Sequence, residues 1–179
     1  INQLKIEEVL YSLKNWFSSK THPKTLQNAK YDRLILLRHG IILNGVVLDT
    51  LLADYISDAT LKHSLDEISY REFGFRPKSY SEIVKKGEDF SQVDIKTASF
   101  YCGMDVYLTR KLAIVYIKRL QDKNEKLKKL LLEVEQPLEE VLAEVESTGI
   151  TIDIPYLKDL SGELTTKLNN IEEEVYKLA

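Results

Sequence analysis

A tyrosine and an aspartate four residues apart are the side chains of this sequence whose types and spacing first suggest chemistry. Tyr101 and Asp105 belong to the stretch F-Y-C-G-M-D at residues 100–105, and apolar residues follow it at helical intervals. On a helix, positions i and i+4 lie on one face. A phenol and a carboxylate at this spacing can address one point in space, such as a metal-bound water. The alternative interpretation is a buried tyrosine beside a surface aspartate.

A second polar stretch, Q-N-A-K-Y-D at residues 27–32, lies upstream of the first. Its last residue, Asp32, follows a short extended segment and stands at the start of a predicted helix. An aspartate at such a junction is commonly a helix cap, because its carboxylate accepts hydrogen bonds from free N–H groups of the first turn. Asp49, which follows a β-rich run, is also interpreted as a cap. His63 is interpreted as a surface or capping side chain.

Helices dominate the part of the chain that carries both stretches. Apolar periodicity predicts helices over residues 4–17, 31–39, 61–73 and 95–121, and a further helix opened by Asp49. Ser64 and Glu67 have the spacing of a capping box. Extended segments are expected at residues 25–28 and 41–48, with a turn signal at Asn44-Gly45, and residues 74–94 are expected to form a long loop with short helical turns.

The alternation of helix and strand predicts an α/β fold with few strands. So little sheet for so much helix is unusual for a complete domain, and the sequence begins with Ile1 directly in a helical pattern. We therefore expect this chain to be a fragment of a longer protein, with further strands upstream.

The pattern changes after residue 122. Apolar residues recur by threes and fours between residues 127 and 145, across Pro137, which is expected to kink the helix. Residues 150–154 are predicted to form a short strand, and a final helix from residue 155 carries a leucine-rich seam. Two helices joined in this way predict a helical hairpin. We place the domain boundary here, with one domain at 1–122 and a second at 123–179.

Composition restricts the class of protein. Of the 179 residues, 44% are hydrophobic and 30% are charged, which is typical of a soluble globular protein. A single cysteine, Cys102, excludes an intramolecular disulfide, suits a reducing cytoplasm and is expected to be a small buried group. No apolar run approaches a membrane span, and no signal peptide is evident. The net charge of −3 argues against a dedicated nucleic-acid-binding module.

The two polar stretches, in this order and at this spacing, resemble the second and third motifs of the 3′–5′ exonuclease domain in the bacterial DNA polymerase I family. The segments G-V-V-L-D-T-L-L-A-D-Y-I at residues 45–56 and H-S-L-D at residues 63–66 are similar to linking segments of that domain. Residues 135–153 resemble the start of the polymerase domain, at the base of its thumb. The resemblance implies a ribonuclease H-like α/β exonuclease fold whose N-terminal strands are missing from this chain, followed by an α-helical hairpin.

The resemblance also implies roles for individual residues. Asp105 would bind one divalent cation directly, Asp32 would hold a second through water, and Tyr101 would orient the attacking water. Asn28 and Lys30 would contact the single-stranded 3′ end of DNA. The implied cofactor is a pair of Mg²⁺ or Mn²⁺ ions, which prefer oxygen ligands.

Two departures from the family pattern stand out. The Asp-x-Glu of the first exonuclease motif occurs nowhere in this sequence, so we expect the fragment itself to be inactive. Met104 stands where the family usually has an acidic residue, a neighbour that is not one of the metal-binding residues.

The resulting hypothesis is a fragment of a cytoplasmic DNA-directed DNA polymerase that replicates and repairs DNA and removes mispaired 3′ ends. Its expected partners are primer-template DNA and the remainder of the polymerase chain, with no membrane. Two alternatives stay open: a non-catalytic ribonuclease H-like scaffold that positions DNA, and a helical interaction module built on residues 127–179.

Overall fold

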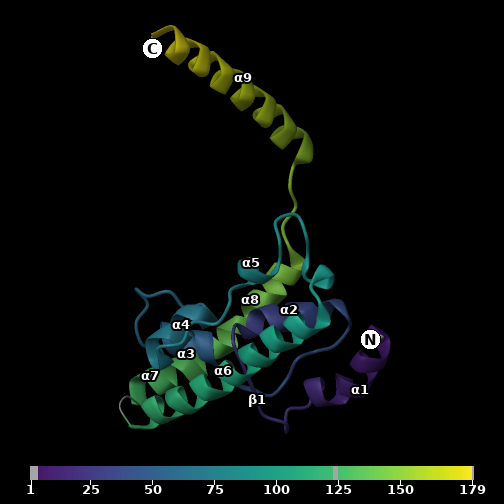
Figure 1. Cartoon of the computed structure of the whole chain (residues 1–179), viewed down its shortest axis with the longest axis vertical. Coiled ribbons are helices and arrows are strands. Elements are labelled where there is room, and N and C mark those ends of the chain that lie inside the picture. The colour runs from purple at the N-terminus through teal and green to yellow at the C-terminus, as the bar shows by residue number, and fades with distance from the viewer. Residues whose placement is uncertain (1–3, 123–124, 179) are drawn as a thin grey trace. The chain divides into compact units, whose positions relative to one another are not determined.

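Two short parallel strands, joined by a helix, lie at the centre of the larger of two units. The computed structural model describes residues 4–122 and 125–178 (Figure 1). The chain divides into a first unit, Ile1–Ser147, and a second unit, Thr148–Ala179. Within the described residues, no helix combines the length and apolar character needed to cross a membrane.

The strands β1 (Lys24–Leu26) and β2 (Val46–Asp49) pair in parallel, with Thr25 opposite Leu48 and Leu26 opposite Asp49. Helix α2 (Ala29–Arg38) forms the crossover between them, and α3 (Thr50–Tyr55) begins directly after β2. Both predicted extended segments are therefore present, although the second is a strand only in its last part. Because the strands are parallel, their carboxyl ends meet at one edge, where both helices start.

The turn before β2 depends on Gly45. Its φ is +74°, and a Cβ atom at this position would lie 2.7 Å from the carbonyl oxygen of Ser19 and 2.8 Å from that of His22. The loop that leads from α1 (Ile6–Ser18) to β1 therefore packs directly on the glycine backbone. This close approach explains why the predicted turn has glycine at this position.

The main core of the first unit lies between α3, α4 (Leu65–Phe73) and the long helix α6 (Ile95–Asp122). The buried side chains are Leu48, Ala53, Ile68, Leu112, Ala113, Tyr116 and Leu131. A smaller cluster of Leu36, Ile41 and Leu43 packs with partly buried residues of α1 and both strands. The predicted helices at 4–17, 31–39, 61–73 and 95–121 correspond to α1, α2, α4 and α6, although α4 begins only at Leu65.

A buried polar network crosses the main core. The Tyr116 hydroxyl donates a hydrogen bond to Oδ1 of Asp54 at 2.7 Å, and His63 and Arg71 both bind Oδ2 of the same carboxylate. Burial raises the pKa of Asp54, but these hydrogen bonds outweigh it, and the net pKa lies below its usual value. The interpretation of His63 as a surface or capping side chain is wrong, because its side chain is only 14% exposed and binds Asp54.

The segment between α4 and α6 contains only α5 (Tyr80–Ile83) and the 3₁₀ turn η1 (Phe90–Gln92), as predicted. Each turn begins with a capping box, Ser79 with Glu82 and Asp89 with Gln92. The capping box expected at Ser64 is not formed. Its partner Glu67 instead binds the Arg76 guanidinium through both carboxylate oxygens, at 2.9 and 3.1 Å.

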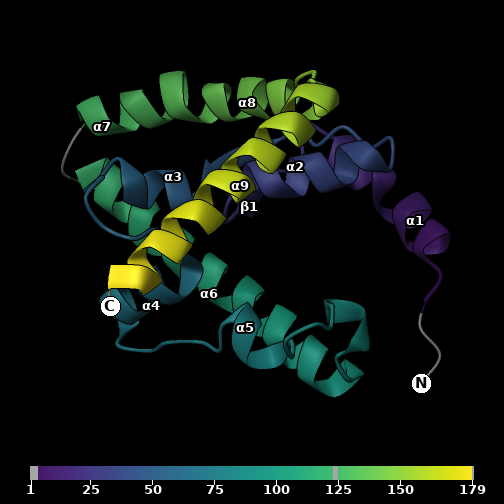
Figure 2. The same cartoon turned by 90° about the horizontal axis from the view of Figure 1, so that it is seen from above.

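In place of the kink expected at Pro137, the structure has a π-helical segment just before the proline. Helix α7 (Glu125–Leu130) passes into the π-helix η2 (Leu131–Glu135) and then into α8 (Gln136–Thr148), and Figure 2 shows α7 and α8 following one another along a single line. Proline lacks an N–H group and crowds the carbonyl group four residues earlier, which favours a wider turn before it. Leu131 of η2 is fully buried in the main core, so this segment packs with the helices before it.

The second unit contains α9 (Ile154–Leu178), which confirms the predicted final helix. The strand predicted at residues 150–154 is wrong: residues 150–153 have no regular structure, and α9 begins at Ile154. Asp153 accepts a hydrogen bond from the Tyr156 N–H at 3.0 Å, and Pro155 suits the first turn of a helix. These start signals outweigh the β-branched run before them. The packing of a helical hairpin, and the boundary between residues 122 and 123, stay predictions.

Candidate functional site

The buried carboxylate of Asp49 organises the edge at which both strands end. Asp49 is the last residue of β2 and is only 2% exposed. Its Oδ1 accepts hydrogen bonds from the N–H groups of Asn28 at 3.0 Å and Leu51 at 2.9 Å, and its Oδ2 accepts one from Ala29 at 2.7 Å. The carboxylate therefore caps α3, as predicted, and also the start of α2, where N–H groups favour negative charge.

Asn28 gives the chain the turn that this double cap requires. Its backbone lies in the left-handed region, with φ 64° and ψ 58°, and among the described residues other than glycine it alone has a positive φ. Asparagine tolerates this conformation better than most residues. Asn28 is exposed, and its side chain makes no capping hydrogen bond. The predicted DNA-contacting residue thus lies at the surface, directly before α2.

Asp32 lies in the first turn of α2 and is half-buried. Burial raises its pKa from the usual value of 3.8 to about 6, and the negative charges of Asp49 and Glu139 contribute to the rise. The ionised form of Asp32 is therefore disfavoured by its surroundings. A carboxylate in this position would be stabilised by a nearby cation, which is common at functional sites.

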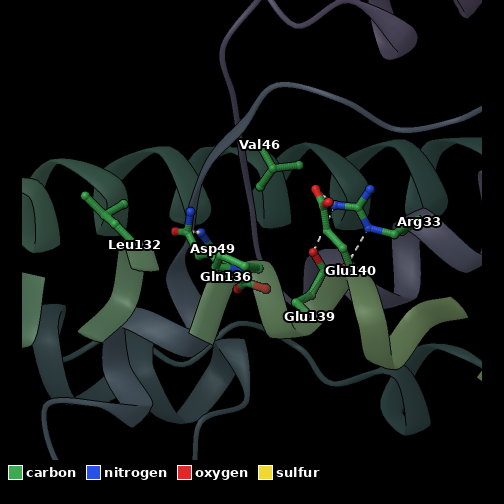
Figure 3. A pocket seen from close by; sticks show the side chains of 8 residues that line it. Arg33, Val46, Asp49, Leu132, Gln136, Glu139 and Glu140 are labelled. Atoms are coloured by element: carbon green, nitrogen blue, oxygen red, sulfur yellow. Dashed lines mark hydrogen bonds and ion pairs between the residues drawn. The ribbon is translucent and has the colours of Figure 1, made fainter. Parts of the chain in front are cut away.

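The two cationic residues that flank Asp32 are both paired with α8. Lys30, the second predicted DNA contact, forms an ion pair with Glu146. Arg33 binds both carboxylate oxygens of Glu139, from Nε at 2.9 Å and from Nη2 at 3.0 Å. Arg33 also binds Glu140 at 3.0 Å and the carbonyl oxygen of Leu43 at 2.6 Å. Figure 3 shows Arg33 facing the two glutamates.

A cavity of about 200 Å³ lies next to these pairs. It is lined by Arg33, Val46, Asp49, Leu132, Gln136, Pro137, Glu139 and Glu140 (Figure 3). On one side the Asp49 N–H donates a hydrogen bond to Oε1 of Gln136 at 3.2 Å. Together with the Arg33 pairs, this contact fastens α8 to the end of β2 and to α2.

Tyr101 and Asp105 lie one turn apart on α6, and each side chain shifts the pKa of the other. The phenol and the carboxylate are therefore near each other, as their spacing predicts. Burial raises the pKa of Asp105, which the neighbouring Tyr101 hydroxyl partly offsets. Burial and the charge of Asp105 also raise the pKa of Tyr101, so the phenol keeps its proton at neutral pH. Phe90 packs against the Tyr101 ring, with the ring centroids 5.9 Å apart.

The predicted site residues thus fall into two groups. Asn28, Lys30 and Asp32 lie at the start of α2, whereas Tyr101 and Asp105 lie on α6. Among residues 4–122 and 125–178, no group of three or more His, Cys, Asp or Glu side chains has an arrangement that could hold a metal ion. The roles assigned to these five residues stay predictions.

Sequence reasoning missed the residues that connect α2 to its neighbours. Asp49 was predicted only as the cap of α3, although an aspartate at a strand end can also reach the helix after the adjacent parallel strand. Neither the sequence around Arg33 nor the sequence around Glu139 indicates that the two side chains form a buried pair. Cys102, expected to be buried, is exposed on α6.

Three comparisons show which known proteins this chain resembles. A family model described as 3′–5′ exonuclease matches residues 1–123. DNA polymerase I of Synechocystis sp. is 44% identical over 160 residues, which is 88% of this chain and 16% of that protein. DNA polymerase I of Rhizobium leguminosarum is 36% identical over 182 residues, covering 99% of this chain and 18% of that protein. The chain thus spans less than a fifth of the length of these two relatives.

A solved structure supports the fold. The POL domain of Pol1 from M. smegmatis, in complex with DNA primer-template and dNTP, matches 98% of this chain and 27% of its own chain. The TM-score is 0.62 at 24% sequence identity. With the family match over residues 1–123, these likenesses lead to one conclusion. The chain belongs to the 3′–5′ exonuclease family of bacterial DNA polymerase I.

Proposed function

We propose that this chain is part of a bacterial DNA polymerase I that synthesises DNA in replication and repair and removes mispaired nucleotides from 3′ ends. The observation that carries the proposal is the neighbouring pair Tyr101–Asp105, one turn apart on α6, within the residues that match the exonuclease family. We further infer that β1, α2 and β2 belong to a ribonuclease H-like sheet and that residues 123–179 begin the polymerase domain. The expected location is the bacterial cytoplasm, close to the nucleoid.

In this proposal, Asp105 and Asp32 would hold divalent cations. Their carboxylate oxygens are the ligand type that Mg²⁺ and Mn²⁺ prefer, and two carboxylates require further ligands, such as an Asp-x-Glu elsewhere in the protein. When bound, such cations supply a nucleophile from water and stabilise the leaving oxygen of the phosphodiester.

Tyr101 would act through its phenol group. The protonated hydroxyl can donate one hydrogen bond, and it keeps a lone pair that can accept a hydrogen bond from a water molecule. Because the raised pKa keeps the phenol protonated, this arrangement holds across the neutral pH range. Tyr101 would therefore orient the attacking water rather than remove its proton.

Asn28 and Lys30 would contact the single-stranded 3′ end of the DNA. Asn28 is exposed, and the Lys30 side chain remains 33% exposed in its pair with Glu146. A DNA phosphate would compete with the Glu146 carboxylate for the ammonium group, since both are anions. Lys30 would then exchange one partner for the other when DNA binds.

The test is the variant Asp105→Ala in the full-length polymerase. We expect it to abolish metal-dependent 3′–5′ digestion of single-stranded DNA while nucleotide addition stays nearly intact. Asp94→Asn is the matched control, because Asp94 stands at the start of the same helix and its carboxylate accepts a hydrogen bond from the Thr97 N–H at 3.0 Å. Equal loss of both activities in Asp105→Ala would indicate a folding role and contradict the proposal.

The fragment alone is expected to be inactive. Residues 1–179 lack an Asp-x-Glu and, in this proposal, the polymerase active site. Robust metal-dependent digestion of DNA by the purified chain would contradict this expectation. The comparisons do not favour a helical interaction module, because the family match and the relatives cover the exonuclease part of the chain.

A further inference from the structure

The contacts of helix α8 with α2 suggest a role for residues that follow the exonuclease match. The family model ends at residue 123, and α8 begins at Gln136. Nevertheless, α8 supplies Glu139, a carboxylate whose side chain is only 7% exposed, to an arginine that is 11% exposed. A buried bidentate pair of this kind fixes the relative position of two helices more strictly than an exposed pair does, because both planar groups must align.

We propose that α8 clamps α2 through the Glu139–Arg33 pair, and that Glu139 is a positioning residue for Asp32. Arg33 directly follows Asp32 in α2, and its guanidinium also binds the Leu43 carbonyl oxygen, so the helix is held on two sides. The part of the proposal that concerns Asp32 rests on the proposed exonuclease function. The clamp itself rests only on the contacts.

Two further contacts support the clamp. Lys30, which precedes Asp32 in the sequence, pairs with Glu146. Arg33, which follows Asp32, pairs with Glu139. Gln136 accepts a hydrogen bond from the N–H of Asp49, and the Asp49 carboxylate holds the N–H groups of Asn28 and Ala29. The first turn of α2 is therefore tied to α8 both directly and through the end of β2. Figure 3 shows the Arg33 contacts with α8 and the position of Gln136 beside Asp49.

The clamp predicts which property of the enzyme changes when Glu139 is altered. If α2 shifts, Asp32 no longer meets a cation at the correct position, whereas the polymerase active site is unaffected. Substitution of a residue that orients a metal ligand, without itself binding the metal, typically lowers metal affinity or activity by about 10- to 100-fold. We expect Glu139→Gln to lower exonuclease activity and raise the Mn²⁺ concentration required for half-maximal activity, each by about tenfold.

The matched control is Glu140→Gln in the same full-length polymerase. Glu140 also binds Arg33, but its side chain is 60% exposed and makes a single contact with the guanidinium. Exposed ion pairs contribute little to stability, so the exonuclease activity of Glu140→Gln should stay within about twofold of that of the parent. Polymerase activity should stay within about twofold in both variants. Glu139→Gln with exonuclease activity and Mn²⁺ requirement equal to those of Glu140→Gln would overturn the proposal.

A double substitution separates positioning from stability. Arg33→Met with Glu139→Met removes both buried charges, and such replacement commonly restores stability that a single substitution loses. We expect the thermal midpoint of this variant to return toward that of the parent while exonuclease activity stays low. Recovery of both properties together would show that the pair only stabilises the fold, and would overturn the positioning role.

Hydrogen exchange of the full-length protein tests the clamp without any activity. Glu139→Gln should increase exchange at the amides of α2 by about tenfold or more, relative to those of α6, because the local opening free energy falls when the pair is lost. A parent polymerase without metal-dependent exonuclease activity would refute the proposed function. In that case faster exchange in α2 would still support the clamp, and unchanged exchange would overturn it.

Discussion

The carboxylate of Asp49 accepts a hydrogen bond from the backbone N–H of Ala29 at 2.7 Å, across 20 residues of sequence. The same side chain caps α3 through Leu51. One buried acidic group therefore satisfies the free amides at the beginning of two helices and ties the ends of two parallel strands together. Without it, the N–H groups of Asn28 and Ala29 would lose this acceptor.

We expect Asp49→Ala to reduce the free energy of unfolding by about 3 kcal/mol, because three hydrogen bonds to a charged acceptor are lost. Urea-induced unfolding of the chain measures the change. The control is Asp58→Ala, since Asp58 is exposed and its carboxylate accepts hydrogen bonds only from Thr60, so this substitution should lower the free energy of unfolding much less. An equal loss of unfolding free energy in the two variants would show that the buried hydrogen bonds of Asp49 stabilise the fold no more than the exposed ones of Asp58.

Asp32→Asn is expected to stabilise the metal-free chain at neutral pH. The folded-state pKa of Asp32 is raised to about 6, so ionisation opposes folding above that pH, and the penalty disappears as the pH falls toward 4. After allowance for solvent screening, we expect a gain of about 1 kcal/mol at pH 8 and none at pH 4. Urea unfolding at both pH values measures it.

The control for this pH dependence is Asp94→Asn. Hydrogen bonds from Thr97 lower the pKa of Asp94, so its ionised form favours folding and the substitution should destabilise at pH 8. A gain from Asp32→Asn that stayed the same at pH 4 would contradict the assigned electrostatic cause.

Tyr101→Phe in the full-length polymerase should lower exonuclease activity less than Asp105→Ala does. The substitution removes an orienting hydrogen bond and keeps the ring that packs on Phe90, so we expect a loss of about 10²-fold at most. Single-turnover digestion of a single-stranded oligonucleotide measures the rate. A loss as complete as that of Asp105→Ala would indicate that the phenol does more than orient water.

Gly45→Ala tests the close approach of the loop after α1. An added methyl group would lie 2.7 Å from the Ser19 carbonyl oxygen, so we expect a cost of about 3 kcal/mol. Gly40→Ala is the matched control, because Gly40 has a similar φ of +68° but no atom within 4 Å of the added carbon. Its cost should be about 1 kcal/mol, from backbone strain alone. Thermal unfolding of both variants gives the difference.

Local patterns predicted most of the helices because apolar residues recur along one face of each, although α1 and α9 contain no buried residue. Leu108, Leu112 and Tyr116 recur by fours on α6 and are buried, and the last two belong to the main core. The same spacing rule predicted the Tyr101–Asp105 contact, which lies within one helix turn. The strand predicted at residues 150–154 was wrong because β-branched residues favour a strand only when a partner strand is available, and Asp153 and Pro155 start a helix instead.

Contacts between distant residues could not be predicted in this way. Arg33 and Glu139 each lie in an ordinary charged helix, and neither sequence neighbourhood indicates that the two side chains are buried together. His63 was misassigned for the same reason, since its partner Asp54 lies nine residues earlier, on the separate element α3. Tertiary packing, and not local propensity, determines these polar pairs.

The separation of 106 residues between Arg33 and Glu139 has a consequence for synthesis on the ribosome. At about 5–20 residues per second, α2 is made about 5–20 s before the carboxylate that pairs with its arginine. During this interval the β1–α2–β2 segment depends on contacts between residues close in sequence. Chief among these are the hydrogen bonds that the Asn28 and Ala29 N–H groups donate to Asp49. The nascent chain thus passes through a stage in which a cationic side chain, later buried, is still solvated and available to chaperones.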